Sequence, residues 1–239
     1  PDVGEAKTKV GLFLPPGVLE KDDVRGGTVV AVGPGTPLPP PADEHEAWKE
    51  GYRAPRFLPL FRKMRRKYSD VHLSIHGGEV DAPGTHVRET LLLGAERIGH
   101  GFNLITDPDT MLLMRNGKNL VEVNLVSNGL LEYATDLDTH PFPEYLRFGV
   151  PVCLNTDDAG SWDSNLTDEY FTAIKHFNLS WDEVTRLGRN SLEHAFAPEA
   201  VKRDRLNRWT VAMALFEQKY GSGDWKKKLE AEGAKVALK

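Results

Sequence analysis

Histidine and carboxylate side chains gather in three short motifs that together could bind a metal ion and move protons. The motifs are His76-Gly77-Gly78-Glu79, Arg97-Ile98-Gly99-His100-Gly101 and Asn155-Thr156-Asp157-Asp158. Neutral imidazole and carboxylate are common zinc ligands, and a nearby carboxylate can serve as a general acid or base. Each motif follows an apolar, β-branched run, so we expect all three to stand at the ends of strands.

Each motif taken singly also has a purely structural interpretation. The first could be a strand-ending turn with a capped carboxylate, and Asp157-Asp158 could be an N-cap and turn, where aspartate is common. We expect His100 to be exposed, because a histidine that packs in a core would normally have bulkier neighbours than glycine. Gly77 and Gly78 lack side chains, which would let a substrate ring approach the backbone. Because successive side chains of a strand point oppositely, one aspartate could bind a metal while its neighbour faces elsewhere.

Side chains from separate motifs can meet only if parallel strands bring their carboxyl ends to one edge of a sheet. From about residue 61 the sequence alternates between strand and helix patterns. We expect strands over residues 71–75, 97–98, 120–126 and 150–154. We expect helices over residues 57–67, 85–93, 108–115, 143–148, 166–177, 181–192 and 198–219, with Ser180 as an N-cap and a frayed tail after Gly221. The pattern predicts four strand–helix units of an α/β fold.

Composition excludes several classes of function. The chain has 239 residues and a formal net charge of −5, and charges of both signs are spread along it. This pattern does not predict the basic surface that binds nucleic acid or an anionic membrane. It contains no run of about 18 apolar residues and no leader-like start. Cys153 is the only cysteine, so no internal disulfide can form. We expect a cytoplasmic protein with no nucleic-acid or membrane partner.

The motifs and their order, over about residues 61–220, resemble the adenosine deaminase-like branch of the metal-dependent amidohydrolases. Four further pairs match in order: Ser127-Asn128, His140-Pro141, Glu169-Tyr170 and Asn190-Ser191. The resemblance implies the C-terminal half, strands 5–8, of a (β/α)8 TIM barrel. There are mild departures, because Ala159 and Gly77 stand where the family usually has proline and alanine.

The resemblance also implies an activity, the zinc-dependent hydrolytic deamination of a purine nucleoside, such as adenosine to inosine plus ammonia. The roles it assigns are zinc ligation by His76 and Asp157, catalysis by Glu79 and His100, and substrate contact by Gly78 and Asp158. The glutamate would protonate the purine ring nitrogen, and the histidine would orient and help deprotonate the attacking water. Relatives act on several purines, and the resemblance does not select one.

One part of the family's site is absent from this sequence. The family's first strand carries a His-x-His pair that supplies two more zinc ligands, and this chain contains no His-x-His. A catalytic zinc normally keeps three protein ligands. Here His76 and Asp157 are two, and His100 would make a distorted third. A complete site therefore requires zinc ligands from a second chain or a missing segment.

The first 60 residues differ in pattern from the rest, because short strand-like runs are separated by glycine, proline and charged residues. They resemble part of the small ring-forming co-chaperonins. The resemblance rests on residues 7–15 and 26–35, followed by a proline-rich linker. It implies contact with a large chaperonin through a loop that ends in Leu12, Phe13 and Leu14. An unrelated β-rich extension is the alternative.

The sequence thus predicts two incomplete domains, a small β-rich segment with its linker over residues 1–60 and a half-barrel with C-terminal helices over residues 61–239. Two functions compete. The first is the deaminase. The second is a non-catalytic protein, either a remnant half-barrel or a chaperonin-binding module.

Overall fold

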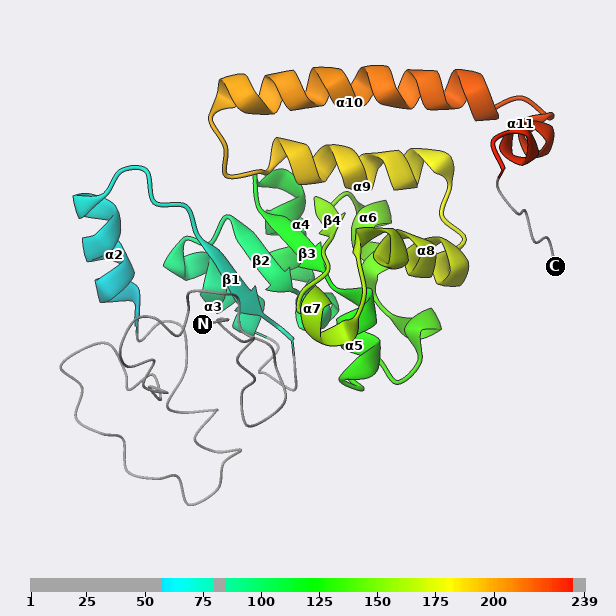
Figure 1. Ribbon diagram of the computed structural model, residues 1–239. Helices are drawn as coiled ribbons and strands as arrows, with labels where there is room; N and C mark the ends of the chain where they lie inside the picture. The colour runs from blue at the N-terminus through cyan, green and yellow to red at the C-terminus, as the bar shows by residue number, and fades with distance from the viewer. Residues whose placement is uncertain (1–56, 80–84, 234–239) are drawn as a thin grey trace, which may run out of the picture. The chain divides into compact units, whose positions relative to one another are not determined.

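The computed structural model describes residues 57–79 and 85–233 (Figure 1). The co-chaperonin-like segment, including Leu12, Phe13 and Leu14, lies outside the described residues. Its predicted contact with a chaperonin and the boundary predicted near residue 60 therefore stay predictions.

A parallel sheet forms the centre of the described part, with its four strands in sequence order. The strands are β1 (Ser74–Gly77), β2 (Arg97–His100), β3 (Leu120–Val123) and β4 (Val152–Leu154). Parallel neighbours that are consecutive in sequence need a crossover, and helices supply each one. Repeated strand–helix units in sequence order form the wall of a (β/α)8 barrel, so the predicted α/β half-barrel is confirmed.

Helices precede the sheet, connect its strands and follow it (Figure 1). Before β4 these are α2 (Leu58–Lys67), α3 (His86–Leu93), the 3₁₀ helix η2 (Phe102–Thr106), α4 (Pro108–Asn116), α5 (Leu125–Leu130), the 3₁₀ helix η3 (Leu137–Thr139) and α6 (Phe142–Phe148). After β4 come α7 (Ala159–Trp162), α8 (Leu166–Phe177), α9 (Trp181–Glu193), α10 (Glu199–Tyr220) and α11 (Trp225–Ala231).

The observed elements differ from the predicted ones in two informative places. The third strand ends at Val123, three residues early, and Ser127-Asn128 lie inside α5 rather than after a strand. Part of the predicted frayed tail after Gly221, residues Trp225–Ala231, forms α11. The Lys228 ammonium holds this helix to the end of α10 by donating a 2.8 Å hydrogen bond to the carbonyl of Lys219.

The hydrophobic core lies between the sheet and the helices that cover it. Strand residues Ile98, Val121, Val123 and Val152 are fully buried. They share this core with side chains from the connecting helices, among them Met114, Leu125, Phe142, Tyr145, Leu146 and Leu187. Burial of apolar side chains is the main force that fixes the sheet.

Helices α8 and α9 pack against β4, the last strand of the sheet, and α10 packs against α9. Helix α9 begins at a capping box in which Ser180 and Glu183 satisfy each other's backbone N–H groups, so the predicted N-cap is confirmed. The Asn190 amide donates a 2.8 Å hydrogen bond to the Val152 carbonyl and so fastens α9 to β4. Helix α10 runs alongside α9 (Figure 1). No helix among the described residues is both long and apolar enough to cross a membrane.

A buried carboxylate explains why β3 gives way to a helix so early. Glu169, on α8, accepts hydrogen bonds from the backbone N–H groups of Leu125 and Val126, at 2.9 and 3.2 Å. These N–H groups belong to the first turn of α5, where a helix has no backbone acceptors of its own. The side chain of Glu169 is fully buried. That burial raises the pKa of Glu169 to about 7, against the two hydrogen bonds, which lower it.

This shifted pKa predicts a specific pH dependence of stability. The pKa of Glu169 is higher in the folded state than the unfolded value near 4.5, so the folded state binds the proton more tightly. The resulting stabilisation is full below about pH 4.5 and is lost as pH rises through about 7. The loss amounts to at most about 3.5 kcal/mol, at about 1.4 kcal/mol per pKa unit. Glu169→Gln should remove this component, which urea unfolding between pH 4.5 and 7.5 would measure.

Glu193→Gln is the matched control, because Glu193 is exposed on α9. We expect the control to keep the wild-type fall in unfolding free energy. Equal slopes against pH for wild type and Glu169→Gln would contradict the assignment.

Candidate active site

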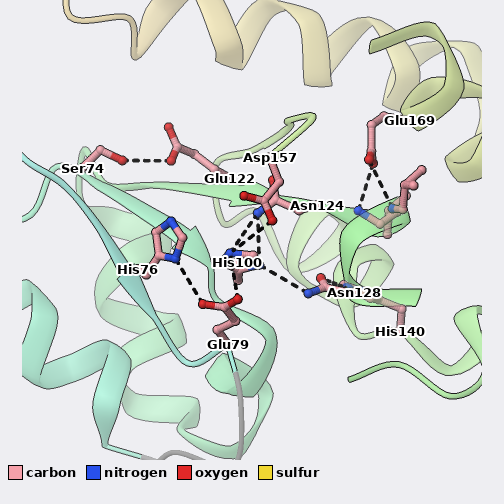
Figure 2. A network of polar contacts seen from close by, with 12 residues as sticks. Ser74, His76, Glu79, His100, Glu122, Asn124, Asn128, His140, Asp157 and Glu169 are labelled. Atoms are coloured by element: carbon pink, nitrogen blue, oxygen red, sulfur yellow. Dashed lines mark hydrogen bonds and ion pairs between the residues drawn. The ribbon is translucent and has the colours of Figure 1, made fainter. Parts of the chain in front are cut away.

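The structure brings His76, His100 and Asp157 together at the carboxyl edge of the sheet. One possible ligand atom from each of the three lies within 4.8 Å of the others. His76 lies on β1, His100 ends β2, and Asp157 follows β4. Figure 2 shows the three side chains converging with Glu79. The predicted convergence of the three sequence motifs is therefore observed.

His76 reaches its neighbours because the next strand has no side chain at the facing position. The register places His76 beside Gly99 of β2. A Cβ atom at position 99 would lie 2.8 Å from the Cδ2 atom of His76, closer than such contacts occur. The His76 ring thereby lies edge-on to the His100 ring, with ring centres 4.7 Å apart. Its side chain stays 64% exposed.

The prediction that His100 is exposed was wrong, because its side chain is fully buried. The loop after β2 is held down over it by Tyr145, which donates a 2.8 Å hydrogen bond to the Phe102 carbonyl and accepts one from the Ile105 N–H at 2.9 Å. The imidazole contacts polar side chains, among them Glu79, Asn124 and Asn128. Burial lowers the pKa of His100, and the negative charge of Glu79 acts in the opposite direction.

Two of the three converging residues have strained backbones. His100 has φ +67° and Asp157 has φ +50°, in the left-handed region that residues other than glycine rarely adopt. Such conformations persist only where the surrounding structure imposes them, and they concentrate at functional sites. The Asp157 carboxylate lies 3.9 Å from Nε2 of His100.

Glu79 joins the two imidazoles. Its Oε2 atom lies 3.1 Å from Nδ1 of His76, and its Oε1 atom lies 3.4 Å from Nε2 of His100. The glutamate side chain is 26% exposed, so it can meet a molecule that enters from solvent. A carboxylate in this place is within reach of both a metal bound nearby and a substrate.

The two residues expected to contact the substrate have other constraints. Gly78 has φ +68°, and a Cβ atom there would lie 2.8 Å from the Val87 side chain, so helix packing already requires glycine. Its N–H donates a 3.1 Å hydrogen bond to Nδ1 of His86. Asp158 is exposed and takes the N-cap position of α7. Their roles toward a substrate stay predictions.

Sequence reasoning missed one residue of the site and gave two others no role. Asn124, the first polar residue after β3, lies against His100, with its Nδ2 atom 3.0 Å from Nδ1 of the imidazole. Asn128 and His140 continue the contact inward. The signal for Asn124 was its place directly after an apolar strand, as for the other site residues.

The histidine that precedes β1 does not belong to this site. His72 stacks on Phe196, with ring centres 4.9 Å apart, and its Nδ1 atom lies 2.9 Å from a carboxylate oxygen of Glu96. These contacts lie toward the amino ends of the strands.

The donor set fits a zinc ion. Two imidazoles and one carboxylate are ligands that zinc takes at about 2.0–2.2 Å, which places tetrahedral donors about 3.4 Å apart. Donor atoms that already lie within 4.8 Å of one another need only small rotations to reach that spacing. Among the described residues, the side-chain oxygens of Asn124 and Ser127 are buried without a hydrogen-bond partner, so the site also has unused polar capacity.

Comparison with known proteins agrees with the family predicted from the three motifs. The sequence model of the adenosine deaminase family matches residues 40–210. An adenosine deaminase of Enterococcus faecalis is 35% identical over 126 residues, which are 53% of this chain and 37% of that protein. The chain spans between 37% and 45% of the length of the first curated relatives that it matches.

Solved structures agree on the fold. The adenine deaminase of Arthrobacter aurescens superposes with a TM-score of 0.63 and 28% identity, over 69% of this chain and 50% of that one. A zinc-bound amidohydrolase of Burkholderia ambifaria gives a TM-score of 0.63 at 19% identity, over 71% of this chain and 47% of that one, and this likeness shows the fold alone. Since the family model matches well over half of the sequence, the chain belongs to the adenosine deaminase family of the metal-dependent amidohydrolases.

Proposed function

We propose that this chain carries half of the active site of a zinc-dependent deaminase, which hydrolyses a 6-aminopurine such as adenosine to inosine and ammonia. The observation that carries the proposal is the convergence of Glu79 with His76, His100 and Asp157 at the ends of β1, β2 and β4. The relatives include an adenosine deaminase and an adenine deaminase, which supports a purine substrate. They do not select between the nucleoside and the base.

His76 and Asp157 would hold the metal, and Glu79 would move the proton. A zinc ion bound there supplies Lewis acidity, which lowers the pKa of a coordinated water to about 7. Hydrolysis adds water to the ring carbon that bears the amino group and breaks the carbon–nitrogen bond, releasing ammonia. Protonated Glu79 would give its proton to the adjacent ring nitrogen, since its side chain is 26% exposed and can meet a substrate that enters from solvent.

A further segment or a second chain would complete the site. Among the described residues, β1 and β4 each pair with only one other strand, and a full barrel has eight. We propose that the missing half supplies the His-x-His ligands and residues that select the substrate. A cytoplasmic location remains a prediction from the sequence.

Zinc binding tests the metal site directly. We expect about one zinc per folded chain, with affinity reduced by about 10-fold or more in His76→Ala and in Asp157→Asn, because each removes a ligand. The control His72→Ala should bind as wild type, since His72 lies outside the site. Elemental analysis and chelator competition measure this. Less than about 0.1 zinc per chain, in protein whose fold is verified by circular dichroism, would exclude a metal site in this chain.

Ammonia release tests the reaction. Once the segment or chain that supplies the missing ligands completes the zinc-loaded site, we expect ammonia release from adenosine or adenine, and we expect Glu79→Gln to lower kcat by about 10²–10⁴-fold, because it removes the proton donor. Glu193→Gln, exposed on α9, should leave kcat unchanged. Zinc binding without any ammonia release from the completed site would favour the alternative of a non-catalytic remnant half-barrel.

Gly99 provides a test of the geometry that needs no substrate. In Gly99→Ala the new methyl group meets the His76 ring, so we expect that ring to be displaced and zinc affinity to fall by about 10-fold. Gly223→Ala is the control, because nothing lies within 4 Å of a Cβ atom there. Unchanged zinc affinity in a folded Gly99→Ala variant would mean that His76 is not held by this contact.

A further inference from the structure

A line of hydrogen bonds runs from the backbone at the start of α6 to the imidazole of His100. It begins at the Phe142 N–H, which donates to Nδ1 of His140 at 3.1 Å. A backbone N–H can only donate, so Nδ1 of His140 must be the unprotonated nitrogen. The proton of the neutral ring therefore sits on Nε2.

The next member of the line has its orientation fixed by the first. Nε2 of His140 lies 3.2 Å from the side-chain oxygen of Asn128. Because this nitrogen carries the proton, the amide atom that faces it must be the acceptor oxygen, which settles an assignment that geometry alone leaves open. The NH₂ group of Asn128 then faces away from His140, toward His100.

That NH₂ group reaches His100 on Nδ1, at 3.3 Å. The amide nitrogen of Asn124 lies 3.0 Å from Nδ1 and 3.3 Å from Nε2, so Asn124 does not distinguish the two ring nitrogens. The Asn128 amide contacts Nδ1 alone, and Nδ1 of His100 must therefore accept its hydrogen bond. Its other nitrogen, Nε2, faces carboxylate oxygens of Glu79 at 3.4 Å and of Asp157 at 3.9 Å. The Asn128 amide at Nδ1 and the carboxylate oxygens at Nε2, whose contacts Figure 2 shows, favour the same arrangement, with the proton on Nε2.

The surroundings leave this line little freedom. The side chains of His100, Asn128 and His140 are 2% exposed or less. The His140 ring lies edge-on to Phe102, with ring centres 5.0 Å apart. Burial lowers the pKa of His140 to about 4, so its ring is neutral at physiological pH. Because His140 is neutral and the line of hydrogen bonds through Asn128 to His100 is buried, the line can hold one arrangement of protons.

We propose that Asn128 and His140 are positioning residues that hold His100 in the tautomer with its proton on Nε2, so that His100 offers the site an N–H donor. In that state His100 cannot accept a proton from water through Nε2, nor ligate a metal through it. It would instead donate a hydrogen bond to Glu79 or to the attacking oxygen. This revises the expectation that His100 helps to deprotonate the water. It also removes His100 from the three converging donor residues and leaves His76 and Asp157 as this chain's metal ligands. The consequence for catalysis rests on the proposed function, whereas the tautomer does not.

The tautomer can be measured without metal, substrate or activity. The full chain, labelled with ¹⁵N-histidine and free of zinc, is studied by long-range ¹H–¹⁵N correlation spectra, which distinguish protonated from unprotonated ring nitrogens. A His100→Gln spectrum assigns the resonances. We expect Nε2 of His100 to be protonated and Nδ1 to be unprotonated, and His140 to show the same pattern. A His100 ring with its proton on Nδ1 would overturn the proposal.

One nearly isosteric variant should reverse the tautomer. In Asn128→Asp both side-chain oxygens are acceptors, so one can still accept from His140 while the other requires a proton on Nδ1 of His100. We expect the protonated and unprotonated signals of His100 to exchange places. The control is Asn119→Asp, whose amide bonds to the Ala95 carbonyl and which should leave His100 unchanged.

The outcomes distinguish a role of Asn128 in setting the His100 tautomer from a role in the stability of the fold. A folded Asn128→Asp protein with the wild-type tautomer would overturn the role of Asn128, whatever its thermal stability. Should that variant fail to fold, the wild-type spectrum alone decides whether His100 carries its proton on Nε2. Failure of the deaminase proposal would appear separately, as absent ammonia release with the tautomer as expected.

Discussion

The parallel pairing of four short strands is the constraint on which the rest of this structure depends. It sets His76 beside Gly99 and Gly77 beside His100, so that residues far apart in sequence end at one edge. Because the strands are only three or four residues long, each delivers its polar residue immediately beyond a buried apolar segment. A shift of one residue in register would turn the imidazole of His76 to the opposite face.

The polar side chains behind the site are as ordered as the apolar core. Glu169 satisfies the first turn of α5, and that helix carries Asn128 toward His100. The Tyr145 hydroxyl holds the loop that follows His100. Buried polar groups are costly unless they are hydrogen-bonded, so these bonds keep the strained backbone of His100 in place. The side of the site that carries His100 is therefore supported from within this chain.

The face of the sheet that includes Ser74, Arg97 and Glu122 is polar as well. Ser74 donates a 2.9 Å hydrogen bond to Glu122, which also pairs with Arg97, and both members of that ion pair are largely buried. The predicted half-barrel accounts for this observation, because a barrel interior is lined by residues from all of its strands. The family's remaining strands would meet these groups, in agreement with a chain that spans under half the length of its first curated relatives.

The fold class, most helix bounds and the three converging motifs could be predicted from the sequence, because strand and helix periodicity and strand-end polarity are local signals. The absence of a His-x-His pair could also be read from it. The three-dimensional contacts were needed to show that His100 is buried, that Ser127-Asn128 lie in a helix, and that Asn124, Asn128 and His140 form a polar network at the imidazole. These features depend on contacts between residues tens of positions apart, such as Glu169 with α5, and no local pattern encodes such contacts.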